Sequence, residues 1–260
     1  MTVRSVSSVN TSKRLSQAGL TLLELLVSMG LGLLLLIGMG TIYLGSKQTY
    51  RMQESNARLQ ETGRYALEII GRSIRQAGFT DMTTKTQFTG TPIQGTNGAS
   101  TNPDTLTVQY DWMSGDSACD GDTTRADGTP ALPGDQIQDY FNLDAATFQL
   151  RCDGVIAPPV LGVPGAGIAI VDGVEDFQVL YGIDTDTDQS ANFYTASPAN
   201  WAQVVSARVC VLVRSANQGL TDTNQRYLNC AGALITAADR RLRRTFVATF
   251  NLRNRVNLQP

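Results

Sequence analysis

A run of apolar residues near the N-terminus constrains the fold of this chain more than any other feature. Residues 20–44 form this run, and Glu24 is the only charged residue within it. As a helix the run would be about 37 Å long, enough to cross a hydrocarbon core of about 30 Å. A charged side chain at membrane depth is costly and usually marks function. Glu24 is therefore the first candidate functional residue.

The residues before this run form a short basic leader. They include Arg4, Lys13 and Arg14, no acidic residue, and many Ser, Thr and Asn residues. A secretory signal carries its apolar stretch before the cleavage site, whereas here the apolar stretch follows Gly19. The sequence therefore predicts that the apolar helix stays on the protein as a membrane anchor.

The helix is expected to continue beyond the apolar run. No proline occurs before Pro92, and Gly78 is a suitable C-terminal stop. The pattern predicts one helix from Leu20 to Ala77 whose second half packs its apolar stripe on the rest of the chain. The residues of that stripe are Met52, Leu59, Ala66, Ile70, Ile74 and Ala77.

The remainder of the chain has a different residue pattern, with frequent turn pairs and no helical periodicity. Turn pairs such as Asn97-Gly98, Asp120-Gly121 and Asp127-Gly128 separate segments in which apolar and polar residues alternate. This alternation predicts strands near residues 106–112, 148–150, 177–181, 205–213 and 246–252. The predicted fold class is therefore α+β, with a long N-terminal helix packed on a β-rich domain large enough to have its own core.

The four cysteines indicate an oxidising compartment. Cys119, Cys152, Cys210 and Cys230 form no Cys-x-x-Cys pair, and the chain has no histidine, which argues against a zinc site. An even number of cysteines favours two disulfides. Three connectivities are possible, and proximity in the sequence favours Cys119–Cys152 and Cys210–Cys230.

The composition argues against catalysis. Without histidine the chain lacks the usual general base, and it has no phosphate-binding Gly-x-x-x-x-Gly-Lys loop. We therefore expect no enzymatic activity and no organic cofactor.

An acidic segment is a candidate calcium site. Carboxylates at alternate positions can converge on one hard cation, but Gln189 replaces the turn glycine of a calcium loop and Thr195 replaces its final glutamate. The other interpretation is a solvated acidic turn. The candidate ligands are Asp184, Asp186, Asp188 and Asn192.

The C-terminal arginines also allow two interpretations. They could form a nucleic-acid patch, or they could pair with acids and pack along a sheet. The second is favoured, because no aromatic residues are interleaved for base stacking, and direct nucleic-acid binding is not expected. The arginines are Arg240, Arg241, Arg243, Arg244, Arg253 and Arg255.

The segment Gly19-Leu20-Thr21-Leu22-Leu23-Glu24-Leu25-Leu26-Val27 resembles the class III signal of type IV pilins and type II secretion pseudopilins. The resemblance implies that a prepilin peptidase cuts after Gly19 and methylates the new amino terminus at Leu20. It also implies that Glu24 pairs with the terminal amine of a neighbouring subunit during assembly. The family usually has Phe after the glycine, so Leu20 departs from its pattern.

Further segments resemble the PilW family of minor pilins. They are residues 46–51, 59–67, 74–78, 171–182 and 239–246. The resemblance implies a removed leader at 1–19, an N-terminal helix at 20–78 with residues 20–44 in the membrane, and a β-rich periplasmic domain at 79–260.

The implied function is that of a minor pilin. With other minor pilins it would form a tip complex that primes assembly of the major pilin and supports adhesion, twitching motility or DNA uptake. Its location would be the inner membrane and then the pilus tip, where an adhesin is a possible further partner. The alternatives are a type II secretion pseudopilin, a tip-exposed module that binds DNA or a surface, and an ordinary single-span anchored protein.

Overall fold

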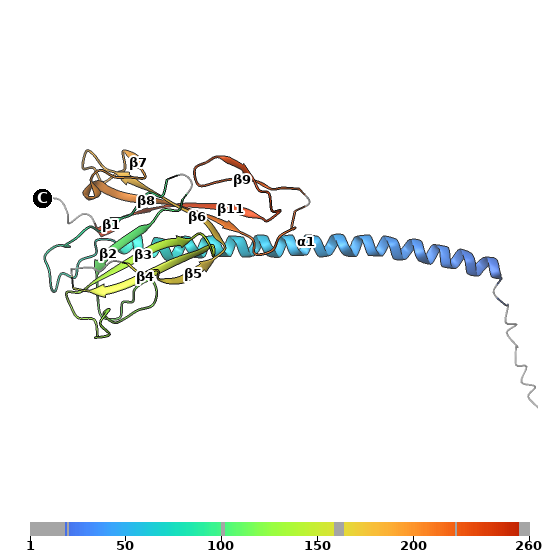
Figure 1. Ribbon diagram of the computed structural model, residues 1–260, viewed down its shortest axis with the longest axis horizontal. Coiled ribbons are helices and arrows are strands. Elements are labelled where there is room, and N and C mark those ends of the chain that lie inside the picture. The colour runs from blue at the N-terminus through green and yellow to red at the C-terminus, as the bar shows by residue number, and fades with distance from the viewer. Residues whose placement is uncertain (1–18, 20, 100–101, 159–163, 222, 255–260) are drawn as a thin grey trace, which may run out of the picture. The chain divides into compact units, whose positions relative to one another are not determined.

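The computed structural model of the chain describes residues 19, 21–99, 102–158, 164–221 and 223–254 (Figure 1). The described chain contains one long helix, α1 (Leu22–Gln76), followed by strands and one short 3₁₀ helix, η1 (Trp201–Gln203). The chain divides into two units, residues 1–49 and 50–260. The strands are β1 (Ile93–Gln94), β2 (Leu106–Asp111), β3 (Gln136–Asp144), β4 (Gln149–Ala157), β5 (Ile168–Asp172), β6 (Val174–Ile183), β7 (Phe193–Thr195), β8 (Val204–Arg214), β9 (Arg226–Leu228), β10 (Leu234–Thr236) and β11 (Arg243–Asn251).

Helix α1 begins and ends close to the predicted positions. It ends at Gln76, one residue before the predicted end, and Leu20 lies outside the described residues. Gly78 follows with a φ of 71°, the left-handed conformation that glycine adopts most easily after a helix. The side-chain amide of Asn254 donates to the carbonyl groups of Arg75, Gln76 and Ala77 at 3.3–3.4 Å. A residue near the far end of the chain therefore satisfies the last carbonyls of α1.

The strands of the second unit form two antiparallel sheets and a separate hairpin. The first sheet has the order β1-β2-β3-β4-β5 and the second the order β11-β8-β6-β7, while β9 pairs with β10. Gly173 alone connects β5 to β6, and its φ of 79° lets the chain turn from one sheet into the other. Figure 1 shows strands of both sheets beside the second half of α1.

The predicted apolar stripe of α1 is the centre of the core. Ala66, Ile70, Ile74 and Ala77 are fully buried, and they belong to one cluster with buried residues of both sheets. Met52, at the start of the stripe, is only half-buried. The stripe therefore joins the helix to the sheets, as the sequence predicts.

Two glycines allow β11 to approach α1 closely. A Cβ atom added to Gly63 would overlap the ring of Phe246, and one added to Gly71 would overlap the ring of Phe250. These rings fill the space where side chains of the helix would lie. Their packing offsets the low helix propensity of Gly63 and Gly71.

Several elements differ from the sequence prediction. Trp112, Phe148 and Leu252 lie just outside β2, β4 and β11. Phe148 has a φ of 58° and belongs to the turn between β3 and β4, and the N–H of Trp112 bonds to the carbonyl of Asp135 in a loop. Apolar residues continue past the strand ends because Trp112 and Leu252 still pack on the core, while the ring of Phe148 packs against the guanidinium of Arg214.

Substitution of Gly71 by Ala tests the helix–strand contact. We expect the change to lower the free energy of unfolding by about 1–2 kcal/mol, because overpacking against Phe250 outweighs the gain in helix propensity. Denaturant unfolding of the full chain in detergent micelles measures the change. Gly38→Ala is the control, since no atom lies within 4 Å of its added Cβ. Equal stability of both variants would contradict the packing argument.

Candidate assembly site

The start of α1 places Glu24 in a capped first turn. The hydroxyl of Thr21 accepts a hydrogen bond from the N–H of Glu24 at 3.3 Å, and the carbonyl of Thr21 accepts one from the N–H of Leu25 at 3.2 Å. Thr21 is therefore the N-cap and Glu24 the third helical residue, the spacing of a capping box. A carboxylate there is also favoured by the positive end of the helix dipole. This local role of Glu24 is encoded by the Thr-x-x-Glu spacing at residues 21–24 and was not predicted.

The carboxylate of Glu24 has no partner within the described residues. No ion pair or side-chain hydrogen bond to it occurs there, and its neighbours are exposed. Leu22 is 79% exposed and Leu25 is 51% exposed, so no described part of the chain covers the apolar surface around Glu24. Among the described residues, α1 is the helix long and apolar enough to cross a membrane.

The predicted processing residues lie directly before this turn. Gly19 is exposed, and a Cβ atom added to it would meet no atom within 4 Å. The residue after it, Leu20, lies outside the described residues. Cleavage after Gly19 and methylation of Leu20 therefore stay predictions.

The four cysteines form two disulfides in the second unit. Cys119 pairs with Cys152 at a Cα–Cα distance of 6.1 Å, and Cys210 pairs with Cys230 at 5.7 Å. The first links the loop after β2 to β4, and the second links the loop between β9 and β10 to β8. This is the connectivity that proximity in the sequence favours.

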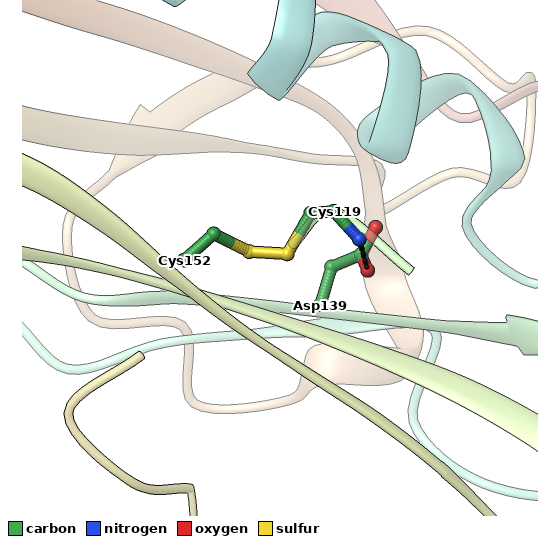
Figure 2. A group of neighbouring side chains, drawn as sticks. All are labelled: Cys119, Asp139 and Cys152. Atoms are coloured by element: carbon green, nitrogen blue, oxygen red, sulfur yellow. Dashed lines mark hydrogen bonds between the residues drawn. A yellow bond between two sulfur atoms is a disulfide. The ribbon is translucent and has the colours of Figure 1, made fainter. Parts of the chain in front are cut away.

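A buried carboxylate that was not predicted from the sequence lies beside the first disulfide. Asp139 of β3 accepts hydrogen bonds from the hydroxyl of Ser73 on α1 at 2.5 Å and from the hydroxyl of Tyr110 on β2 at 3.3 Å. Figure 2 shows its other oxygen accepting the N–H of Cys119, at 2.9 Å. One side chain therefore joins α1, β2 and the disulfide loop. Its sequence signal is an acid between Ile137 and Phe141, which are both fully buried.

Burial changes the protonation of Asp139. Loss of solvation raises its pKa to about 6, although the hydrogen bonds from Ser73, Cys119 and Tyr110 oppose the rise. The folded chain therefore binds this proton more strongly than the unfolded chain does. The stabilisation is full below about pH 4 and is lost as the pH rises through about 6.

Asp139→Asn tests this linkage. The amide oxygen can still accept from Cys119, and its N–H groups can donate to the two hydroxyls. We expect the variant to gain stability relative to the wild-type chain between pH 4 and 7, by up to about 3 kcal/mol. Denaturant unfolding of both chains across that range measures the difference in their free energies of unfolding. The other carboxylates are the same in both chains, so their effects cancel in this difference. Parallel pH profiles for the two chains would contradict the prediction.

The acidic segment forms the loop between β6 and β7. Carboxylate oxygens of Asp184, Asp186 and Asp188 lie within 4.8 Å of one another. Asp184 accepts the N–H groups of Asp186, Thr187 and Gln189 at 2.7–3.2 Å, so its charge is already stabilised by the loop backbone.

The fourth candidate ligand does not join this cluster with its oxygen. The side-chain oxygen of Asn192 accepts from the N–H and hydroxyl of Thr185, and its amide donates to Asp186 at 3.2 Å. The fold thus brings the three carboxylates together and turns the oxygen of Asn192 toward Thr185. Calcium binding stays a prediction from the sequence.

Two of the C-terminal arginines are held by acids and carbonyl groups. Arg243 forms ion pairs of 2.6 Å with both Glu175 and Asp239, and these hydrogen bonds lower the pKa of Asp239 far below its usual range. Arg241 donates to the carbonyls of Ser215 and Ala216. The geometry at Arg241 and Arg243 agrees with the structural interpretation, and Arg255 lies outside the described residues.

Comparisons with known proteins agree with this geometry. Residues 142–254 match the family described as type IV pilus-assembly protein W, or PilW. No curated protein sequence matches the chain. The resemblance to the PilW family is therefore confirmed, with the match lying in the β-rich part of the chain.

Two solved structures were matched to the chain, and the first has the higher TM-score. A type IV-like pilin from Thermus thermophilus matches with a TM-score of 0.51 and 14% sequence identity, covering 76% of this chain and 96% of that chain. The GspK-GspI-GspJ complex of the type 2 secretion system from enterotoxigenic Escherichia coli gives a TM-score of 0.34 and 7% identity, covering 72% of this chain and 96% of that chain. The first match confirms the predicted α+β, type IV pilin-like fold.

Proposed function

We propose that this chain, whose residues 142–254 match the PilW family, is a minor pilin that helps to initiate a type IV pilus. The observation that carries the proposal is the first turn of α1. It has an unpartnered carboxylate at the head of an exposed apolar helix, which suits a subunit that docks through that helix. The pilus is preferred to a secretion pseudopilus because the matching family is one of pilus assembly.

The proposed mechanism is recruitment through charge pairing. Cleavage after Gly19 would give Leu20 a charged amine in an apolar setting, where an unpaired charge costs several kcal/mol. The carboxylate of Glu24 on an adjacent subunit would neutralise that amine and thereby fix the axial position of the two helices. The capping hydrogen bond, donated by the backbone N–H of Glu24 to the hydroxyl of Thr21, holds the first turn in place without engaging the carboxylate.

The second unit would present the surface that selects partners. Its two disulfides suit the periplasm and the cell exterior, so residues 20–44 would span the inner membrane with the β-rich domain outside. Other minor pilins and the major pilin are the proposed partners. The role is structural, and adhesion, twitching motility or DNA uptake would follow from piliation.

Glu24→Gln separates assembly from helix capping. Glutamine can replace glutamate in a capping box, so the first turn should persist while the charge is lost. We expect the number of pili per cell to fall at least about tenfold, because each 1.4 kcal/mol of lost pairing is tenfold in affinity. Electron microscopy of cells that carry the variant as their only copy measures piliation.

Two control variants accompany this test. Thr21→Ala removes the cap and keeps the charge, and Glu54→Gln removes a charge that forms an exposed pair with Arg58 on the same helix. Both should remain piliated. Mass spectrometry should show that the mature chain begins at Leu20 in every variant. Normal piliation with Glu24→Gln, or a mature chain that still begins at Met1, would overturn the proposal.

A further inference from the structure

Strand β11 is an edge strand whose backbone groups alternate in direction. Its residues pair with β8 in one continuous register from Arg243 to Asn251. Just beyond its ends, the carbonyl of Leu242 accepts from Ser215 and the N–H of Leu252 donates to Val205, so the even-numbered residues bond to β8. In an antiparallel ladder the odd-numbered residues then direct their N–H and C=O groups to the opposite, free edge.

The first part of this free edge is closed by a side chain. The amide of Gln225 accepts from the N–H of Arg243 at 2.6 Å and donates to the carbonyl of Arg243 at 3.1 Å. The hydroxyl of Thr245 donates to the carbonyl of Leu228 in β9. Gln225 thus makes the two hydrogen bonds that a neighbouring strand would make, and its contact shows that the edge accepts an amide group.

The second part of the edge has no such cover. Within the described residues, the outward N–H and C=O groups of Val247, Thr249 and Asn251 have no hydrogen-bond partner. Proteins usually protect an edge with lysine, proline or a bulge, and residues 245–252 contain none of these. Val247 is 57% exposed.

The strand that carries the open edge, β11, packs against α1 with one of its faces. Phe246 and Phe250 fill the spaces above Gly63 and Gly71 of α1, which fixes the strand between them. A partner would therefore meet a preformed template, and the ordering cost of binding would fall mainly on the partner.

The charges around the edge are positive. Arg244 and Arg253 are exposed and form no ion pair within the described residues. Arg244 lies near the start of the strand and Arg253 follows its last residue, whereas the guanidinium of Arg208 on β8 lies over the ring of Tyr194 on β7 and does not face the free edge. These side chains favour acidic groups on a partner and disfavour a second copy of β11, which would bring like charges together.

We propose that the free edge of β11, from Val247 to Asn251, accepts an extended segment of a partner polypeptide with acidic residues at its ends. The segment would add a strand to the sheet through backbone hydrogen bonds to Val247, Thr249 and Asn251. The β9–β10 hairpin and Gln225 end the accessible edge at Thr245. This inference goes beyond the proposed function, because the purified full chain would bind the segment whether or not it assembles into a pilus.

A synthetic peptide tests the proposal directly. The probe is a short peptide with a core of alternating threonine and valine and two glutamates at each end, labelled for fluorescence anisotropy. We expect it to bind the full chain in detergent micelles, and we expect binding to weaken when salt is raised. The same peptide with methylated backbone nitrogens throughout its core should bind at least about tenfold more weakly, because it lacks the N–H donors.

Thr249→Pro tests the same edge from the protein side. Proline removes the outward N–H of residue 249 and leaves the bonds of Ala248 and Phe250 to β8. The variant should bind the peptide at least about tenfold more weakly, while Thr249→Ala should bind as the wild-type chain does. Intact disulfides and an unchanged near-ultraviolet circular dichroism spectrum confirm folding, and if the proline variant does not fold, the methylated peptide decides.

Three results would overturn the proposal. They are no peptide binding, equal binding of the methylated and unmodified peptides, and a folded Thr249→Pro variant that binds as tightly as Thr249→Ala. Light scattering provides one more outcome. A dimer of the wild-type chain that Thr249→Pro abolishes would identify a second copy as the occupant and would contradict the assignment to an acidic partner.

Discussion

The packing of α1 on the two sheets is the interaction on which the rest of the second unit depends. One helical stripe, with Ala66, Ile70, Ile74 and Ala77 at its centre, contributes to a core shared with both sheets. The phenylalanine rings of β11 occupy the space that side chains at Gly63 and Gly71 would need, so the strand lies close to the helix. The same helix continues into residues whose apolar side chains remain exposed in the described chain. A single helix therefore has one half that contributes to an internal core and another half whose apolar side chains no described residue covers.

Polar groups then determine which arrangement of these elements is the stable one. Asp139 connects α1, β2 and the loop of Cys119 by three hydrogen bonds in a fully buried position, although burial of its charge is unfavourable. An apolar residue there would pack without requiring Ser73 or Tyr110 in a particular place. A buried, fully bonded carboxylate instead penalises every other position of the helix along the sheet. On the second sheet, Arg243 has a comparable role, because Glu175 and Asp239 together hold it at the start of β11.

The sequence predicted the parts of the structure that depend on local pattern. The helix, its buried stripe and the long strands β2, β6, β8 and β11 follow from the spacing of apolar residues, and Glu24 is identified by its charge in an apolar run. Strands β1, β5, β7, β9 and β10 were not predicted, since they are short and most of their residues are exposed or half-buried, so their alternation is weak. The long strand β3 was not predicted either, because its buried face and its other face both carry polar residues, among them the buried Gln136, Gln138 and Asp139. The bonds of Asp139 and the edge cover by Gln225 join residues far apart in the chain, and no local pattern encodes such pairs. The role of Thr21 as N-cap was available from the Thr-x-x-Glu spacing and was missed.

The cap that Asn254 provides for α1 has a consequence for the order in which the chain can fold. The helix is synthesised first, yet the rings that pack at Gly63 and Gly71 and the side-chain amide that bonds to the carbonyls of residues 75–77 come from residues 246–254. Until residues 246–254 take their places, the close approach of β11 to the helix is missing and the stripe of α1 stays partly uncovered. The second unit therefore cannot complete its core by adding elements in the order of synthesis, and a chain cut before residue 246 would present apolar surface to chaperones and proteases.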